Sequence, residues 1–234
     1  MEKALLITPS EAESLLSGRK LPGAGFAALI VGSEFCQNQV PALSLLKRLA
    51  RAFPGVGLSL ATSILTDSGL RRWETLFRAL RGTRLVAEVV ANDWGIFPLL
   101  KKTGPFKLSS GRLLTTELTR TDAAWASGFI REHGLASAET DAPQRAAAAA
   151  ALGLAVSWHP GPAFRSVTTF CPFEKHYNSR CAHSCGGKLV KLSNPLIPYP
   201  LLLSEKAYFA PAGKQPGRAA RPWRTVTTFN FRAN

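Results

Sequence analysis

Three of the four cysteines lie in one short segment, FCPFEKHYNSRCAHSC, at residues 170–185. Cys171 is the first of them, and Cys181 and Cys185 follow it as a C-x₃-C pair. The fourth, Cys36 in GSEFCQ, lies 135 residues before Cys171. Thiolates bind tetrahedral zinc and iron–sulfur clusters. If the fold brings Cys36 to the other three, these residues can hold a metal centre.

The spacing of the cysteines leaves three interpretations open. A structural zinc site usually takes its sulfurs from two close pairs, whereas this chain has one pair and two single cysteines. An iron–sulfur cluster is larger and accepts ligands from more widely spaced loops. Free cysteines are also common as small buried apolar residues, so chance clustering is the third interpretation. His176 and His183 lie among the thiols as possible ligands of a mixed zinc site.

The chain of 234 residues carries a net charge of +14, and the charge is unevenly distributed. Residues 172–234 hold ten Lys or Arg against two Glu, so this segment supplies +8. A basic surface indicates nucleic acid, an anionic substrate or an acidic partner, or simply a solvated face. The sequence has no apolar run long enough for a signal peptide or a membrane span, which predicts a cytoplasmic protein. Cysteines in that reducing compartment favour ligands over disulfides.

Apolar runs with strand character alternate with segments of helical periodicity over most of the chain. The best helix has an N-cap at Asp141, proline in its first turn, an alanine body and Gly153 at its end. Another has capping-box spacing at Ser10–Glu13. The predicted strands are 26–33, 56–63, 84–93, 105–110, 135–140 and 154–159, and the helices between them are 40–53, 69–81, 94–102, 121–134 and 141–153.

This alternation predicts parallel strands joined by right-handed crossovers. Six units fall short of the eight in a full barrel. We therefore expect a single α/β domain over residues 1–234 with a TIM-barrel-like (β/α) fold that is abbreviated or incomplete. An open doubly wound sheet is the alternative. Residues 1–170 supply the β/α units, 171–187 the cysteine loop, and 188–234 an irregular, β-rich, basic segment that completes or covers the open side.

Polar residues near the predicted strand ends are candidates for substrate contacts, because parallel α/β folds build their sites there. The four candidates are Glu34, Asp93, Arg112 and His159. Each has a structural alternative: Asp93 as a helix cap, Arg112 as a surface charge and His159 as a hydrogen-bonded residue beside Pro160. No nucleophile-and-base pair stands out, since Ser157 and His159 are close only in sequence, so catalytic residues stay unassigned.

Three motifs resemble the U32, collagenase-like peptidase family over residues 27–209. VGSEFC is similar to the first-strand motif of the family's iron–sulfur branch, and Cys36 matches its cluster cysteine. VVANDWG is similar to a later strand and turn, and FCPFEKHYNSRCAHSC to one cysteine, a loop and a C-x₃-C pair. That branch includes paired proteins required for oxygen-independent hydroxylation in ubiquinone synthesis.

The resemblance implies a [4Fe–4S] cluster held by Cys36, Cys171, Cys181 and Cys185, with zinc as the alternative. It implies a redox function, such as oxygen-independent hydroxylation of an aromatic or isoprenoid substrate, and a heterodimer with another U32 protein. Other branches modify RNA, and the basic segment here offers charge beside aromatic rings, so RNA is a second hypothesis. Peptidase activity is a third, suggested by the family's label. The rings are Tyr208, Phe209, Trp223, Phe229 and Phe231.

Overall fold

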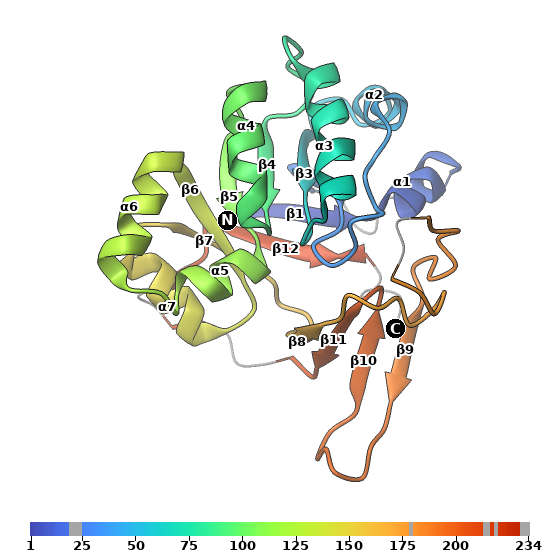
Figure 1. Cartoon of the computed structure of the whole chain (residues 1–234), viewed down its shortest axis with the longest axis vertical. Helices are drawn as coiled ribbons and strands as arrows, with labels where there is room; N and C mark the ends of the chain where they lie inside the picture. The colour runs from blue at the N-terminus through green and yellow to red at the C-terminus, as the bar shows by residue number, and fades with distance from the viewer. Residues whose placement is uncertain (19–24, 178–179, 213–215, 218–219, 230–234) are drawn as a thin grey trace.

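Eight parallel strands close into a barrel in the computed structural model, which describes residues 1–18, 25–177, 180–212, 216–217 and 220–229. The order around the barrel is β1-β12-β7-β6-β5-β4-β3-β2, and every neighbouring pair is parallel (Figure 1). The TIM-barrel-like class is therefore confirmed. The strands are β1 (Glu2–Ile7), β2 (Ala28–Gly32), β3 (Gly57–Ala61), β4 (Glu88–Ala91), β5 (Lys107–Ser110), β6 (Leu135–Thr140), β7 (Ala155–Trp158) and β12 (Arg224–Thr228).

The barrel is complete, which corrects the expectation of an incomplete one with six strands. The two additional strands come from opposite ends of the chain: β1 precedes the first predicted strand, and β12 lies in the segment expected to be irregular. They pair with each other over Glu2–Leu6 and Arg224–Thr228. A short strand such as β12 has little periodicity of its own, and its parallel neighbours determine its conformation.

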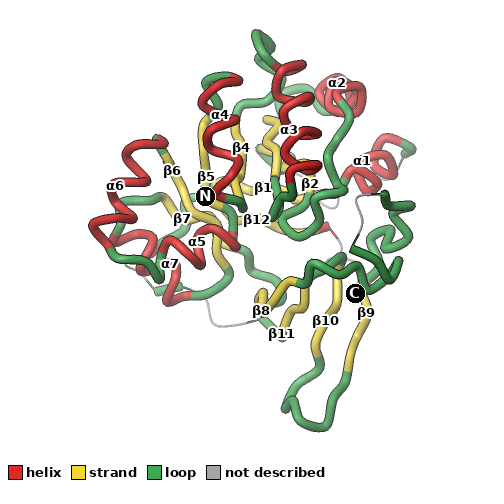
Figure 2. The backbone as a smooth tube through the Cα atoms, in the orientation of Figure 1, coloured by secondary structure: helices red, strands yellow, loops and turns green. Residues whose placement is uncertain are grey.

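Helices cover the outside of the barrel (Figure 2). Their apolar side chains pack against the strands: Leu46 and Leu49 of α2 and Trp73 and Phe77 of α3 are fully buried. The first helix is capped by Thr8 and Glu11, which corrects the predicted capping box at residues 10–13. The helices are α1 (Pro9–Leu16), α2 (Leu43–Ala52), α3 (Asp67–Leu80), η1 (Trp94–Ile96), α4 (Phe97–Thr103), α5 (Arg112–Leu118), α6 (Ala123–His133) and α7 (Pro143–Ala151).

A second, antiparallel sheet is inserted between β7 and β12, where a standard barrel would have its last helices. Its order is β8-β11-β10-β9, and it lies below the barrel in Figure 1. Phe164 of β8 and Phe209 of β11 pack on Phe35, which belongs to the loop after β2. The sheet therefore covers the end of the barrel that carries this loop. Its strands are β8 (Ala163–Val167), β9 (Leu189–Leu192), β10 (Leu201–Ser204) and β11 (Ala207–Ala210).

Among the described residues, no helix has both the length and the apolar character that a bilayer span requires.

Candidate functional site

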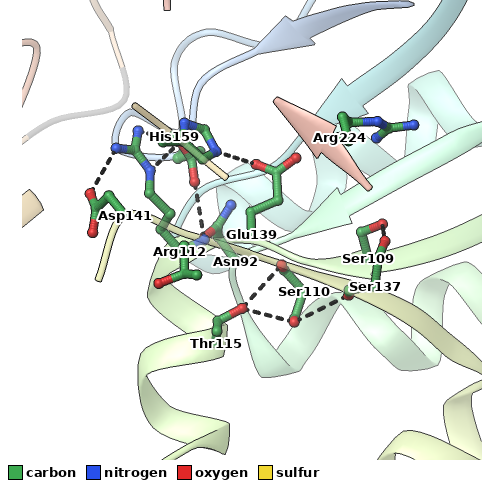
Figure 3. A network of polar contacts seen from close by, with 12 residues as sticks. Asn92, Ser109, Ser110, Arg112, Thr115, Ser137, Glu139, Asp141, His159 and Arg224 are labelled. Atoms are coloured by element: carbon green, nitrogen blue, oxygen red, sulfur yellow. Dashed lines mark hydrogen bonds and ion pairs between the residues drawn. The ribbon is translucent and has the colours of Figure 1, made fainter. Parts of the chain in front are cut away.

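Arg112 is the centre of a buried ion-pair network at the carboxyl end of the barrel strands (Figure 3). Its Nε and Nη2 atoms lie 2.9 and 2.6 Å from Oε2 of Glu34, and its Nη1 lies 3.1 Å from Oδ2 of Asp141. Its backbone N–H donates to Oε1 of Glu34. Burial alone would lower the pKa of Arg112, but Glu34 and Asp141 outweigh it and raise that pKa. The alternative of Arg112 as a surface charge is therefore wrong.

Close packing between the loop after β4 and the start of α5 holds Arg112 in place. Oδ1 of Asn92 accepts the N–H of Leu113, and its Nδ2 donates to the carbonyl of Thr62. A Cβ on Gly111 would lie 2.1 Å from the Asn92 side chain, so only glycine fits before Arg112. The loop after β4 and the first turn of α5 are thus locked together.

His159 is paired with Glu139, a residue that sequence reasoning did not select. Nε2 of His159 lies 2.9 Å from Oε2 of Glu139, and both side chains are buried. Burial, with repulsion from Glu88, raises the pKa of Glu139 to about 8, while burial and Arg112 lower the pKa of His159 to about 3. Both groups are therefore uncharged near neutral pH, and the carboxylic acid can donate to the imidazole.

Three buried polar atoms converge beside this pair without a partner among the residues that the structure describes. They are Oε1 of Glu139, Nδ1 of His159 and Oγ of Ser157. Ser157 stands opposite Glu139 in the β6–β7 register and makes no hydrogen bond to His159. A serine nucleophile with His159 as its base is thus not assembled here.

Glu34, Glu139 and His159 bring three ligand atoms within 4.8 Å of one another, close enough for a single ion. Both oxygens of Glu34 are already bonded to Arg112, however. A cation bound there would have to lie beside the guanidinium, which opposes binding.

Cys36 lies near the three cysteines of the later loop, as the resemblance implied. The Cys36 thiol interacts electrostatically with Cys185, and Cys185 in turn with Cys181 and Cys171. Cys36, Cys171 and Cys185 are buried, and Cys181 is half-buried. Two segments far apart in sequence thus bring their thiols together.

The sulfurs of Cys171 and Cys181 each accept a backbone N–H, from Glu174 and His183. The backbone N–H groups of Asn38 and Gly186 act to lower the pKa of Cys36 and Cys185. For Cys171 and Cys181 the donor lies 3.4 and 3.3 Å from Sγ. Such hydrogen bonds favour the thiolate and are one way in which proteins tune iron–sulfur sites.

The unbound thiols resist deprotonation in spite of these donors. Burial, with Glu205, raises the pKa of Cys36 to about 12, and the same causes raise the pKa of Cys185 to about 11. The cation that opposes this for Cys36 is Lys206, which sequence reasoning did not select. Holding four thiolates here therefore requires a compensating positive charge.

The carboxylate of Glu174 organises the loop that carries the C-x₃-C pair. It accepts the backbone N–H groups of Ala182 and Ser184 at 3.1 and 3.0 Å. Those donors, and Nε2 of His176 at 3.0 Å, lower the pKa of Glu174 well below its usual range. Of the two histidines considered as zinc ligands, His176 thus contacts the Glu174 carboxylate, and His183 is exposed.

No three cysteine sulfurs of the described chain lie within 4.8 Å of one another. A single tetrahedral ion needs its ligands that close, whereas a cubane cluster holds its thiolates farther apart. The described cysteines are therefore not arranged around a single tetrahedral ion.

Asp93 is the N-cap of η1, which confirms its predicted structural role: its Oδ1 accepts the N–H of Gly95 at 2.7 Å. It also lines a cavity of about 460 Å³ next to the Arg112 network. Of the four candidate contacts, Glu34, Arg112 and His159 thus lie in one buried cluster, and Asp93 lies in the adjoining cavity.

The aromatic rings predicted to stack on RNA are mostly involved in packing. Phe209 is buried, Phe229 packs on the barrel core, and Trp223 lies against Lys107 and Arg224. Phe231 lies outside the described residues. The hypothesis that the basic segment binds RNA stays a prediction.

The fold and the polar carboxyl end define a TIM-barrel-type α/β protein. No protein-family model and no curated protein matches the sequence. Among solved structures, the U32 peptidase Mk0906 matches with a TM-score of 0.54 and 12% identity, covering 97% of this chain and 92% of that one. A GH10 endoxylanase from a sugarcane soil metagenome matches with a TM-score of 0.43 and 10% identity, over 75% and 71%. The chain therefore shares its fold with a U32 peptidase over nearly its whole length.

Proposed function

We propose that the protein binds a [4Fe–4S] cluster through Cys36, Cys171, Cys181 and Cys185, and that it serves a redox reaction such as oxygen-independent hydroxylation. The observation that carries the proposal is the convergence of Cys36 with three thiols contributed more than 130 residues later. The backbone N–H groups that the sulfurs of Cys171 and Cys181 accept support the proposal, because they favour the thiolate form.

The surroundings of the four thiols suit a cluster. A bound cluster would supply one-electron transfer at the mouth of the barrel. Ser33 positions Cys36, because its Oγ accepts the N–H groups of Phe35 and Cys36, both at 3.0 Å. Glu174 holds the loop of Cys181 and Cys185, and the backbone donors keep the sulfurs oriented.

The substrate would lie at the carboxyl end of the strands, where the Arg112 network and the Glu139–His159 pair form a buried polar wall. An aromatic or isoprenoid molecule suits the apolar surface of the adjoining cavity. The uncharged Glu139–His159 pair can hold a proton there without bringing an uncompensated charge into the barrel.

Anaerobic purification tests the proposal. We expect iron and labile sulfide in about a 4:4 ratio per chain and a broad visible sulfur-to-iron absorbance. Each of the four Cys→Ser variants should lose most of the iron. His183→Ala is the matched control, since this exposed residue of the same loop should leave the spectrum intact. Zinc at one per chain without sulfide, or unchanged iron in Cys36→Ser, would contradict the proposal.

A further inference from the structure

The 460 Å³ cavity beside the Arg112 network has the size of a small-molecule site. It opens between the segments that follow β3 and β4, helix α5, the first turn of α7 and strand β8. Its lining combines apolar side chains with several charged ones. The lining includes Ile64, Trp94, Arg120, Arg145, Phe164 and Arg165.

Three arginines from three separate elements line this cavity. Arg120 follows α5, Arg145 lies in the first turn of α7, and Arg165 lies in β8. Arg145 is half-buried, and the other two are exposed. Within the described ranges, none of the three guanidinium groups makes an ion pair or a hydrogen bond. They contrast with Arg112 and Arg224, whose guanidinium groups are bonded to carboxylates.

The acidic residues of the lining do not neutralise these arginines. Asp93 and Glu117 stand against three arginines, which leaves the lining with a positive charge. Both oxygens of Asp93 already accept backbone N–H groups, from Gly95 and Leu65 at 2.7 and 3.0 Å. Guanidinium groups are the preferred partners of carboxylates and phosphates because of their planar, forked donors.

Apolar side chains form the rest of the cavity surface. Ile64 and Trp94 at its edge are 49% and 38% exposed, which is unfavourable for large apolar groups unless something covers them. Phe164 forms another wall. A ligand that suits this lining has an apolar body and an anionic group.

Phe164 also connects the cavity to the cysteines. Its ring stacks on Phe35 with centroids 5.2 Å apart, and Phe35 directly precedes Cys36. Only the Phe164 ring therefore separates a molecule that contacts this residue in the cavity from Phe35, the neighbour of Cys36 in the sequence.

We propose that this cavity binds a small anionic molecule with an apolar body, whose carboxylate or phosphate is held by Arg120, Arg145 and Arg165. Binding itself does not depend on the cluster. Identifying this molecule as the substrate of the redox reaction rests on the proposed function.

Isothermal titration calorimetry with 3-phenylpropionate, phenyl phosphate and the neutral 3-phenylpropanamide tests the proposal on the full chain. We expect the two anions to bind saturably and the amide to bind at least about tenfold more weakly, a difference of about 1.4 kcal/mol. The stronger of the two anions identifies the head group as carboxylate or phosphate. Equal binding of the amide, or no binding of either anion, would overturn the proposal.

Arginine variants test whether the site is the one described. Arg145→Gln should weaken anion binding about tenfold, and the triple Gln variant should abolish it. Arg71→Gln, an exposed arginine of α3 that does not line the cavity, is the matched control. Circular dichroism confirms that each variant is folded. Wild-type affinity in the folded triple variant, or competition by single-stranded RNA with no binding of small anions, would contradict the assignment.

Iron and sulfide measured on the same samples separate the two proposals. If the variant with all four cysteines replaced by serine lacks iron but binds the anions, anion binding in the cavity does not require the cluster, and the cavity assignment is supported. If the wild type contains iron and sulfide but binds no anion, the cavity assignment alone is wrong.

Discussion

The two ends of the barrel each bury an arginine among carboxylates, but they differ in how completely the polar atoms are bonded. At the amino end, both oxygens of Glu88 have partners: Arg224 at 2.7 Å, and the hydroxyls of Ser59 and Ser109. At the carboxyl end, Glu139 keeps one oxygen without a partner in the described structure. Fully bonded networks stabilise a fold, whereas convergent unbonded groups indicate a place for a ligand.

This contrast agrees with the division of labour common in parallel barrels, where the carboxyl end carries function and the amino end stability. The inserted sheet and the cysteine loop are both added at the carboxyl end. The comparison leads to three predictions, taken in order of expected effect.

Arg224→Met should have the largest effect on stability. It leaves the Glu88 carboxylate buried without its cation, and breaking a buried ion pair in this way costs about 3–5 kcal/mol. Urea unfolding measures the change. Iron content and anion binding of the protein that remains folded should match the wild type, since Arg224 does not line the cavity and does not act on the thiols of Cys36 or Cys185.

The control for this prediction is Arg78→Met, which removes an exposed ion pair with Glu74. That variant should change the free energy of unfolding by less than about 1 kcal/mol. If Arg224→Met unfolds no more easily than the control, the amino-end network is not structural.

Gly32→Ala should have an intermediate effect on stability and a clear effect on the cysteine site. Gly32 has φ +136°, and a Cβ there would lie 2.3 Å from the carbonyl oxygen of Ala61. Forcing strands β2 and β3 apart costs about 1–3 kcal/mol and shifts the loop of Cys36. Thermal unfolding and iron content measure both consequences.

Gly57→Ala, at the start of β3, is the matched control, since its Cβ would be in ordinary contact with Ala27. It should alter stability by less than about 1 kcal/mol and leave iron content unchanged. Normal iron in Gly32→Ala would show that the loop tolerates the shift.

Stability should fall as the pH rises from about 6.5 to about 8. Glu139 has a raised pKa of about 8, so the folded protein keeps a proton that the unfolded chain has lost. The depressed pKa of His159 gives the opposite slope, but that slope ends near the ordinary histidine value of 6.5. Glu205, whose pKa burial also raises to about 8, adds a slope of the same sign. Each of the two carboxyls contributes at most about 1.4 kcal/mol per pH unit.

Glu139→Gln should flatten this slope, because glutamine mimics the protonated acid. Urea unfolding at several pH values compares it with the wild type and with Glu132→Gln, a change at an exposed position of α6. Because Glu205 contributes a similar slope, part of it should remain. A slope in Glu139→Gln equal to that of the wild type would mean that the Glu139 carboxyl is ionised throughout this range.

Most of the barrel could be predicted from local patterns. The strand at 135–140 and the helix closed by Gly134 were recognisable because periodicity and capping act over a few residues. Strand β1 and helix α5 were missed, since ALLI is short and RLLTTEL begins with an arginine that is usually exposed. Their assignment depends on neighbours distant in sequence.

The candidate site was only partly predictable. Glu34, Arg112 and His159 could be selected because strand ends are recognisable, but the paired residues Glu139 and Asp141 could not. Lys206 and Glu205 were unpredictable for the same reason: they lie in the turn between β10 and β11, which folds back toward Cys36. No local pattern encodes that contact.

The sequence by itself determined the α/β class, the helix faces and the identity of the four thiols, because apolar periodicity, caps and residue type are local properties. Only the tertiary structure decided that eight strands close, that Arg112 is buried and that three arginines face one cavity. Closure pairs the first strand with the last, and burial then selects which charges must be matched. Those outcomes depend on contacts between separate elements, 222 positions apart for Glu2 and Arg224 and 78 positions apart for Glu34 and Arg112, which no short segment can specify.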